Sequence, residues 1–541
     1  LLLMLPAVAG ASVDPDMALH AYARARLADG EGALGVAVDS YRVALAGDPT
    51  SLAIARRSYV QALESGDMPL ALQSAALLDE GGMLPRDGTL LRICDALGRK
   101  DWAAAQTFTD RLVEEGNFSF LAPIVQSWIS LGQRRYVAPV IDGKDKFGAL
   151  GARYLDEHLA LQAMARGDKE EAIGAMRRAL ALRVTDDEAL RLTFAAQLAG
   201  RRAKADALAL LPADEASFAK ARADVARGKV PGAIAAPFTP RQGFAQLLAR
   251  LAVDIASDET GTALGIRLAR IATFADPAAA EPHLVAAKLL VAGDLANYAA
   301  AEARKLPVTG WYGALAQAEL VEALAASGDR DGAIALAQSL ASAPNAEPER
   351  LVRLGRLLAD SGDFDGAASA FHRAQAGYSA DSLPWALLLF EGSALEQGKR
   401  WDEARVVLEK AAIMAPNEPV ILNYLGYAQI ERRQNVDAAL DLLKKASALK
   451  PQDASITDSL GWAKFVTGDV KGAVPVLERA AAGAPGDATI NEHLGDALWT
   501  AGRRYEARYA WRAAAVFAEG DVANRLDAKA REGLKPEYAA P

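Results

Sequence analysis

The chain has 541 residues, of which 51% are hydrophobic but only 6% aromatic, and the apolar surplus consists mostly of alanine and leucine. These residues favour helices, and the alternating Val-, Ile- and Thr-rich runs that mark strands are nearly absent, so the composition argues for an all-α fold. The formal charge of −9 argues against the basic stripe of a nucleic-acid-binding protein, and a single cysteine, Cys94, excludes an intramolecular disulfide and a cysteine metal cluster.

Residues 1–11 resemble the end of a secretory signal peptide. Leu1 to Leu5 form an apolar run, and Ala9-Gly10-Ala11 before Ser12 fits the small-x-small rule for cleavage. We therefore expect a signal-peptide remnant and a periplasmic protein that reaches the outer membrane only through partners. The alternative is the apolar end of a first helix in a cytoplasmic protein. No later stretch reaches about 18 consecutive apolar residues, so we expect no transmembrane segment in the mature chain.

Residues 12–227 predict a first solenoid of helical hairpins with a degraded repeat pattern. A recognisable second helix carries Ala37 and, four positions later, the large residue Tyr41. Residues 141–148 predict a loop between hairpins. Further helical pairs are expected at 51–78, 87–112 and 187–211.

Residues 228–241 interrupt the helical pattern with glycines and prolines, among them Pro231 and Pro240. Such a composition is typical of a linker between domains, so we expect a junction between two solenoids there. A second solenoid is expected at 242–517. Its first hairpins are predicted at 244–277, 281–306 and 311–344.

The C-terminal part repeats with a period of about 34 residues, which is the period of the tetratricopeptide repeat (TPR). Each copy has a glycine on its first helix, an alanine early in its second helix, and a large apolar residue four positions after that alanine. These three positions are Gly355, Ala367 and Phe371; Gly392, Ala404 and Leu408; Gly426, Ala439 and Leu443; Gly461, Ala473 and Leu477; and Gly495, Ala507 and Trp511.

Helix packing explains this pattern. The glycine and the alanine mark the place where two backbones nearly touch, and a larger residue there would cost about 1–3 kcal/mol. No hairpin can bury its apolar face alone, so hairpins must stack. We therefore predict an all-α, TPR-type α-solenoid, a right-handed superhelix of roughly a dozen helix pairs, closed by a capping helix and tail in residues 518–541.

Three C-terminal first helices resemble one family of exported proteobacterial TPR proteins. The resemblance is carried by the motifs NYLGY at Asn423–Tyr427, DSLGW at Asp458–Trp462 and HLGD-x-LW at His493–Trp499. It implies an envelope protein that acts as an adaptor, and some relatives are lipoproteins that present substrates to carboxyl-terminal-processing proteases. This chain departs from those lipoproteins because no lipidation cysteine follows its signal-like segment.

The sequence contains no His-Glu-x-x-His motif, no Gly-x-Ser-x-Gly elbow and no phosphate-binding glycine loop. Its five histidines are scattered without metal-ligand spacing. His493 follows Glu492, and Asp458 and Asp496 could suggest paired carboxylates, but polar residues on neighbouring first helices are more commonly groove or capping contacts. We therefore expect no enzymatic activity, no cofactor and no metal.

First helices line the inner surface of a TPR superhelix, so their polar and aromatic residues are candidate contacts for partner proteins. For the three large aromatic candidates, packing between repeats is an equal alternative. Asp458 and Glu492 stand where some TPR domains clamp a partner's terminal carboxylate with basic residues, so we expect a neutral or basic extended segment, or an amphipathic helix, as ligand. The candidates are Asn423, Tyr427, Asp458, Trp462, Phe465, Glu492, Asp496 and Trp499.

Three classes of function are open. The favoured one is a non-catalytic scaffold or adaptor of the bacterial envelope that binds partner segments in its concave groove and delivers clients to a protease or an assembly machine. The second is a structural subunit that stabilises a larger envelope complex through its convex face. A TPR-bearing enzyme is the least favoured, because no unassigned stretch has the size of a catalytic domain, about 100 residues or more.

Overall fold

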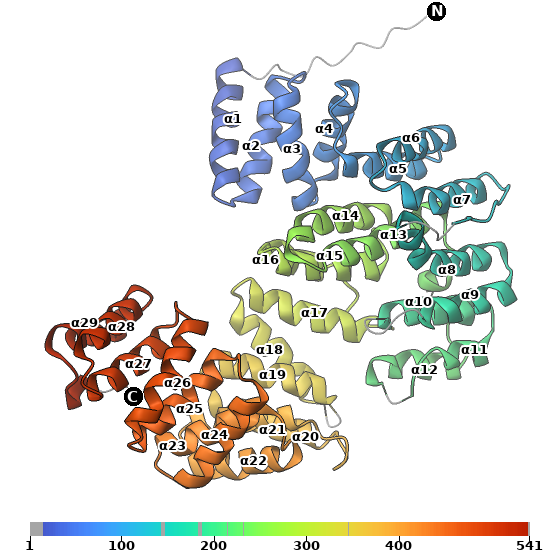
Figure 1. The fold of residues 1–541 in the computed structure, drawn as a ribbon. Helices are drawn as coiled ribbons and strands as arrows, with labels where there is room; N and C mark the ends of the chain where they lie inside the picture. Colours follow the sequence, from blue (N-terminus) through green and yellow to red (C-terminus); the bar gives the residue numbers. More distant parts are fainter. Residues whose placement is uncertain are drawn as a thin grey trace, which may run out of the picture. The chain divides into compact units, whose positions relative to one another are not determined.

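The computed structural model describes residues 14–141, 146–181, 187–213, 215–230, 232–343 and 346–538. These residues form 29 α-helices joined by turns and short 3-10 helices, and no strand occurs among them (Figure 1). Consecutive helices pack in pairs, which confirms the predicted all-α solenoid of helical hairpins. None of the described helices is both long enough and apolar enough to cross a membrane. The signal-like residues 1–11 lie outside the described part.

Contacts divide the chain into two compact units, Leu1–Leu336 and Ala337–Pro541. The first unit also contains the 3-10 helices η1 (Ser119–Leu121), η2 (Ala216–Phe218), η3 (Gly232–Ala235) and η4 (Glu259–Gly261). Helix α18 (Arg330–Ala341) spans the division. The other helices of the first unit are α1 (Pro15–Gly30), α2 (Leu34–Gly47), α3 (Leu52–Ser65), α4 (Met68–Glu80), α5 (Arg86–Arg99), α6 (Trp102–Glu115), α7 (Ala122–Gly132), α8 (Lys146–Arg166), α9 (Lys169–Ala181), α10 (Glu188–Gly200), α11 (Lys204–Ala209), α12 (Ala219–Ala226), α13 (Pro240–Ile255), α14 (Thr262–Ala275), α15 (Ala280–Ala292), α16 (Ala296–Ala303) and α17 (Gly313–Ala326).

Polar caps begin some of the helices and glycines end several, as the hairpin α3–α4 illustrates. Ser51 begins α3 by accepting a hydrogen bond from the amide of Ile54 at 3.5 Å. Gly66 ends α3 with a φ of 88°, a left-handed conformation that glycine adopts without a steric penalty. Asp67 then begins α4 by accepting from the amide of Leu70 at 3.2 Å. The sharp turn between paired helices is therefore encoded locally.

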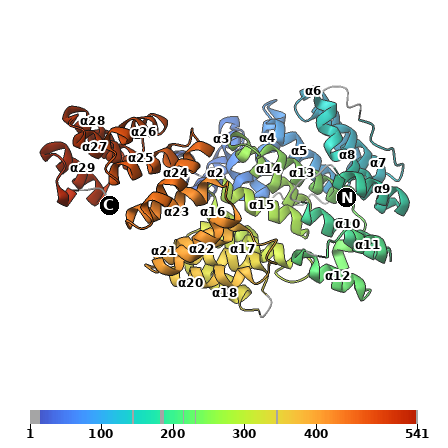
Figure 2. The same ribbon diagram turned by 60° about the horizontal axis from the view of Figure 1, so that its bottom comes forward.

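The later helices of the first unit pack against the inner side of its earlier hairpins. In both views α13, α14 and α15 lie inside the arc of α3 to α12 (Figures 1 and 2), and α14 contacts α3 and α5 while α13 contacts α5, α7 and α8. Gly243 of α13 is so close to Trp128 of α7 that a Cβ there would come within 2.2 Å of the indole. The Cys94 sulfur in α5 lies 3.9 Å from the Ile271 carbonyl oxygen in α14. The first unit therefore covers its own inner face.

Ion pairs that are partly or fully buried fix this inner layer. Arg267 of α14 donates from Nε to Asp87 of α5 at 2.8 Å. Arg270 of α14 pairs with Glu302 of α16, and both side chains are at most 3% exposed. Burial alone would favour the neutral carboxyl, but hydrogen bonding from His283 and the charge of Arg270 lower the pKa of Glu302 to about 2. Glu302 is therefore ionised at neutral pH.

Residues 228–241, where the sequence predicts a junction, lie inside the first unit. Gln197 of α10 donates from Nε2 to the carbonyl oxygens of Ile234 at 3.0 Å and Ala236 at 2.6 Å, which holds this segment on α10. The observed division comes later in the chain, within α18. Proline and glycine break helices whether or not the chain leaves a domain, so their abundance locates an irregular segment and not a boundary. Of the predicted loop at 141–148, residues 142–145 lie outside the described ranges, and α8 already begins at Lys146.

The second unit consists of stacked hairpins that follow the predicted repeat. Its helices are α19 (Pro348–Asp360), α20 (Phe364–Gln375), α21 (Trp385–Gln397), α22 (Trp401–Met414), α23 (Pro419–Glu431), α24 (Val436–Leu449), α25 (Ala454–Val466), α26 (Val470–Gly483), α27 (Ala488–Thr500), α28 (Arg504–Val516) and α29 (Gly520–Glu532), followed by η5 (Pro536–Tyr538). The last α-helix, α29, packs on α28 at the position of the predicted cap.

The repeat glycines lie where two helices approach closely. An added Cβ at any of them would stand 2.4–2.9 Å from the large side chain of the following helix, closer than any real contact allows. The close approach predicted from the glycine spacing is therefore confirmed. The pairs are Gly355 with Phe371, Gly392 with Leu408, Gly426 with Leu443, Gly461 with Leu477, and Gly495 with Trp511.

Candidate partner-binding groove

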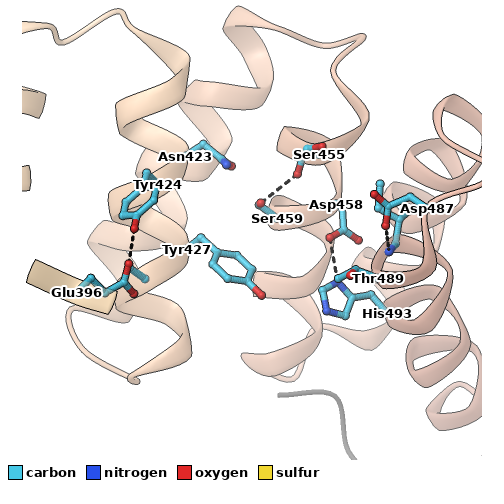
Figure 3. Close-up of a pocket in the computed structure, with 12 residues that line it drawn as sticks. Glu396, Asn423, Tyr424, Tyr427, Ser455, Asp458, Ser459, Asp487, Thr489 and His493 are labelled. Carbon is cyan, nitrogen blue, oxygen red and sulfur yellow. Dashed lines mark hydrogen bonds and ion pairs between the residues drawn. The ribbon is translucent and has the colours of Figure 1, made fainter. Parts of the chain in front are cut away.

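An open groove of about 380 Å³ crosses the first helices of consecutive hairpins in the second unit (Figure 3). α23 contacts α25 and α25 contacts α27, because first helices stand side by side when hairpins stack. Side chains from α21, α23, α25 and α27 therefore meet in one place. The lining residues are Glu396, Asn423, Tyr424, Tyr427, Ala428, Ser455, Asp458, Ser459, Asp487, Thr489, Ile490 and His493.

Helix α23 forms one wall through Asn423, Tyr424 and Tyr427, which share a helix face. Tyr424 donates its hydroxyl hydrogen to Glu396 of α21 at 2.5 Å, which anchors its ring. Tyr427 is half-buried, and burial together with nearby carboxylates such as Glu431 raises its pKa, so its hydroxyl keeps its proton at neutral pH. The Oδ1 atom of Asn423 is buried without a hydrogen-bond partner. This wall combines an aromatic surface with an unused acceptor.

Helix α25 forms the opposite wall around Asp458, which is 5% exposed. The Oδ2 atom of Asp458 lies 2.8 Å from Nδ1 of His493 on α27. A dashed line marks this contact in Figure 3. Its Oδ1 atom is also buried but has no hydrogen-bond partner. Beside it, Ser459 donates its hydroxyl hydrogen to the carbonyl oxygen of Ser455 at 3.0 Å. One oxygen of the Asp458 carboxylate is thus satisfied by the protein, and the other has no donor.

Carboxylates dominate the charge of the groove. Glu396, Asp458 and Asp487 line it, and none of the lining residues is Lys or Arg. Glu396 is paired with Arg432 at 2.9 Å, and Asp487 caps α27 by accepting from the amide of Ile490 at 3.0 Å. Of these three carboxylates, Glu396 is thus paired with a guanidinium group, whereas Asp458 contacts an imidazole and Asp487 a backbone amide.

Three of the predicted contacts, Asn423, Tyr427 and Asp458, line the groove together. Most of the other lining residues were not predicted, although the sequence carries a signal for them. Tyr424 follows Asn423 directly, and Ser455 lies one turn before Ser459 on the helix that carries Asp458. Extending the prediction along the same helix faces by one turn would have found them.

Trp462 and Phe465 pack between repeats instead of lining the groove. Trp462 is 5% exposed and donates from Nε1 to Glu431 of α23 at 2.8 Å. Its ring stacks on His493 with 4.0 Å between centroids, and on Phe465 with 5.1 Å. The alternative of inter-repeat packing thus describes both residues. Trp462 supports the groove from behind, because it holds the imidazole that binds Asp458.

Glu492 and Asp496, which the sequence predicts as partner contacts, are buried beneath α29. Arg525 of α29 donates to Glu492 through two hydrogen bonds of 2.8 Å. Lys529, which is fully buried, donates to Glu492 at 2.6 Å and to Asp496 at 2.8 and 2.9 Å. Burial opposes ionisation of Glu492, yet the charges of Arg525 and Lys529 lower its pKa. For Asp496 the effect of burial is larger than that of Lys529, so its pKa is raised. Helix α29 therefore covers the surface through which a partner would have to contact Glu492 and Asp496.

Trp499 is half-buried at the same end of the unit. The guanidinium groups of Arg504 and Arg508 lie 5.2 and 5.1 Å from its ring centroid. An added Cβ at Gly533, just after α29, would come within 2.2 Å of the ring. Trp499 therefore packs against the C-terminal cap, and it lies outside the groove lined by α21 to α27.

A regular series of polar pairs links the first helices of the second unit. In each pair a carboxylate accepts a hydrogen bond from a donor about one repeat later in the chain, on the next first helix or on α29. The series fixes the register in which hairpins stack and leaves few carboxylate oxygens free. Its members are Glu396 with Tyr424, Glu431 with Trp462, Asp458 with His493, Glu492 with Arg525, and Asp496 with Lys529.

Within the described ranges, no group of three or more His, Cys, Asp or Glu side chains is arranged to hold a metal ion. No family model matches the chain, and no curated protein is similar to it in sequence. Among solved structures, "MamA MSR-1 C2" is 20% identical and covers 34% of this chain and 97% of its own, with a TM-score of 0.27. "Crystal structure of MamA" is 25% identical and covers 30% and 92%, with a TM-score of 0.26. These similarities are confined to about a third of the chain, and nothing about function follows from them.

Proposed function

We propose that this protein is a non-catalytic interaction scaffold that binds segments of partner proteins in the groove of its second unit. The observation that carries the proposal is the open groove on the first helices of the second unit. The first unit fills its own inner face with α13 to α15 and secures it with buried ion pairs. The second unit leaves an open groove of about 380 Å³ on its first helices, with polar atoms that lack partners. Its lining comes from the first helices of consecutive hairpins, so a segment bound there would contact several repeats at once.

The resemblance of the C-terminal motifs to exported proteobacterial TPR proteins supports an envelope location and an adaptor role. In that role the scaffold brings client proteins to a protease or an assembly machine. A periplasmic location predicts a processed N-terminus near Ser12, which mass spectrometry of the protein purified from its native cells would detect. A native N-terminus at Met4 or upstream would contradict cleavage at this site.

Site-specific photo-crosslinking in intact cells tests the binding surface. A photoreactive residue at Thr489, an exposed position in the groove, should capture varied, substoichiometric partners if the protein is an adaptor. The same residue at Asp441, an exposed position on the second helix α24, is the control. Equal adducts from both positions, or none from Thr489, would contradict the groove as the binding site.

A structural role in a larger complex is the second candidate, and one observation favours it. The outer face of α28 exposes Tyr505 by 83%, Tyr509 by 69% and Val516 by 74%. These residues follow helical spacing and form a stripe that no part of the described second unit covers. A photoreactive residue at Tyr509 that captured one fixed set of proteins, with no adducts from Thr489, would favour this role over the adaptor.

A further inference from the structure

We propose that the groove of the second unit selects partner segments that carry a lysine, whose ammonium group pairs with the Oδ1 atom of Asp458. The inference rests on the proposed function, because it assigns the chemistry of a segment bound in that same groove. It goes beyond a general preference of an acidic groove for basic segments, because it names one acceptor atom and one kind of cation.

Asp458 carries a buried oxygen that no donor of the described chain satisfies. Asp458 is 5% exposed, and its Oδ1 atom has no hydrogen-bond partner although its Oδ2 atom is bound by His493 at 2.8 Å. A buried carboxylate oxygen without a donor is unfavourable, because it has lost water and gained nothing in return. A donor supplied by a ligand would complete the shell of Asp458.

The surface around Asp458 has a charge and a chemistry that favour a cation. Asp458 shares the groove with two further carboxylates, and no Lys or Arg lines it. Asn423 presents a second buried acceptor without a partner from the opposite wall. Figure 3 shows Tyr427 extending from α23 toward Asp458 and His493. An aromatic ring beside a carboxylate favours a cation over a neutral donor.

The geometry of Asp458 distinguishes lysine from arginine. A guanidinium group binds a carboxylate best through two parallel hydrogen bonds, one to each oxygen. Because His493 occupies Oδ2, only Oδ1 remains, and a compact ammonium group needs no more than one oxygen. Asp458 therefore suits lysine better than arginine.

The first unit shows how helices of this chain hold a non-helical segment. Residues 135–141 run along α7 without regular structure. Ser127 donates its hydroxyl hydrogen to the carbonyl oxygen of Val137 at 2.7 Å, and the amide of Val137 donates to Ser130 at 2.9 Å. Ser455 and Thr489 place exposed hydroxyls in the groove of the second unit. They could hold the backbone of a non-helical segment in the same manner while its lysine reaches Asp458.

The test uses the full chain and pools of short peptides, acetylated at the N-terminus and amidated at the C-terminus. Each pool has a fixed central Lys, Arg, norleucine or Glu among mixed uncharged residues, and retention on the immobilised protein is quantified by mass spectrometry. We expect the Lys pool to be retained about tenfold better than the norleucine and Glu pools, and better than the Arg pool, as an ion pair formed out of water would give.

Two variants locate the effect. Asp458→Asn should abolish the preference for Lys over norleucine, whereas Asp441→Asn, at an exposed aspartate outside the groove, should leave it intact. Because Asp458→Asn also removes the pair with His493, Thr489→Lys provides a second variant at an exposed groove position. Its ammonium group should compete with the ligand and lower retention of the Lys pool about tenfold without altering the fold.

The outcomes distinguish failure of the lysine assignment from failure of peptide binding in the groove. Equal retention of all pools, preference for Arg, or a Lys preference that survives Asp458→Asn would overturn the lysine assignment. If Tyr427→Ala then lowered retention of every pool, peptide binding in the groove would stand without the lysine preference. Retention of no pool above the level seen with Thr489→Lys would overturn both.

Discussion

Individual residues of the second unit act through close approach and through buried polar pairs. At Gly495 both effects meet, because a Cβ there would lie 2.4 Å from the indole of Trp511, which is fully buried. Trp511 also donates from Nε1 to Asp496 at 2.8 Å. A displacement of this indole would therefore disturb a hydrogen bond as well as the packing.

Gly495→Ala should destabilise the second unit by about 1–3 kcal/mol, although alanine is the better helix former, because the added methyl group displaces the indole of Trp511. Urea unfolding followed by tryptophan fluorescence measures the change. Gly174→Ala is the matched control, because the nearest atom to its added Cβ is the flexible end of Arg178 at 3.6 Å. The control should be neutral or slightly stabilising, and an equal loss at both positions would refute the packing argument.

His158 of α8 makes the stability of the first unit depend on pH. It is fully buried, its Nδ1 accepts from Trp128 Nε1 at 3.0 Å, and burial lowers its pKa from 6.5 to about 3. Between those two pH values His158 is protonated in the unfolded chain but not in the folded chain, so the free energy of unfolding falls as the pH falls. One pKa unit corresponds to about 1.4 kcal/mol, so we expect a loss of about 2 kcal/mol between neutral pH and about pH 5.

His158→Gln removes this titration and keeps an acceptor for Trp128. The variant should therefore show a flatter dependence of unfolding free energy on pH than the wild-type chain, measured by urea titrations across the acidic range. Identical slopes in the two proteins would show that His158 does not control the acid response.

Among the helices, α29 is the element whose position most changes the candidate site. Its Arg525 and Lys529 bind Glu492 and Asp496 of α27, and its Leu526 is fully buried in the last hydrophobic cluster. The helix thereby takes the place of a further first helix and ends the series of polar pairs. It also confines the open groove to α21 through α27.

Lys529→Met should destabilise the second unit by about 3–5 kcal/mol, because Asp496 and one side of Glu492 would remain buried without their cation. Thermal unfolding followed by circular dichroism checks this. Lys535→Met is the matched control, because Lys535 forms an exposed pair with Glu532 that contributes little. If Asp496→Asn combined with Lys529→Met recovered no stability, the loss would come from packing and not from the unpaired charge.

At the scale of the whole molecule, both units are built from helical hairpins, but the inner surfaces of those hairpins are covered differently. In the first unit α13 and α14 cover the inner sides of α3, α5 and α7, so the stack becomes a compact body with its own core. In the second unit the corresponding first helices of consecutive repeats leave a groove open to solvent. The sequence of either hairpin alone would not distinguish these outcomes, because the difference lies in which surface the later helices cover.

A fragment that ends at residue 227 tests the closure of the first unit. Removal of α13 to α17 should expose the inner faces of α5 and α7, including Trp128, so this fragment should aggregate or unfold without cooperativity. A fragment that ends at residue 336 should be monomeric and unfold cooperatively. Size-exclusion chromatography with light scattering and thermal circular dichroism compare them. A cooperative, monomeric shorter fragment would contradict the role given to the later helices.

Much of the fold could be predicted because it is local in sequence. The repeat glycines, the alanine four residues before each large residue and the capped turns specify hairpins, since each acts within one or two turns of helix. The positions of Asn423, Tyr427 and Asp458 in one groove follow for the same reason, since they share one face of neighbouring first helices. The missed lining residues, such as Tyr424 and Ser455, lie on that face and needed only a wider search along it.

The sequence by itself thus determined the helices, their pairing and the face that carries the groove, because helix propensity and packing periodicity are encoded within a few tens of residues. Only the tertiary structure decided which inner surfaces remain open. Trp128 contacts Gly243, and Asp87 pairs with Arg267, across more than a hundred residues, while Glu492 is covered by Arg525 from the last helix. Such contacts depend on how stacked hairpins curve and meet, and no local pattern records that curvature.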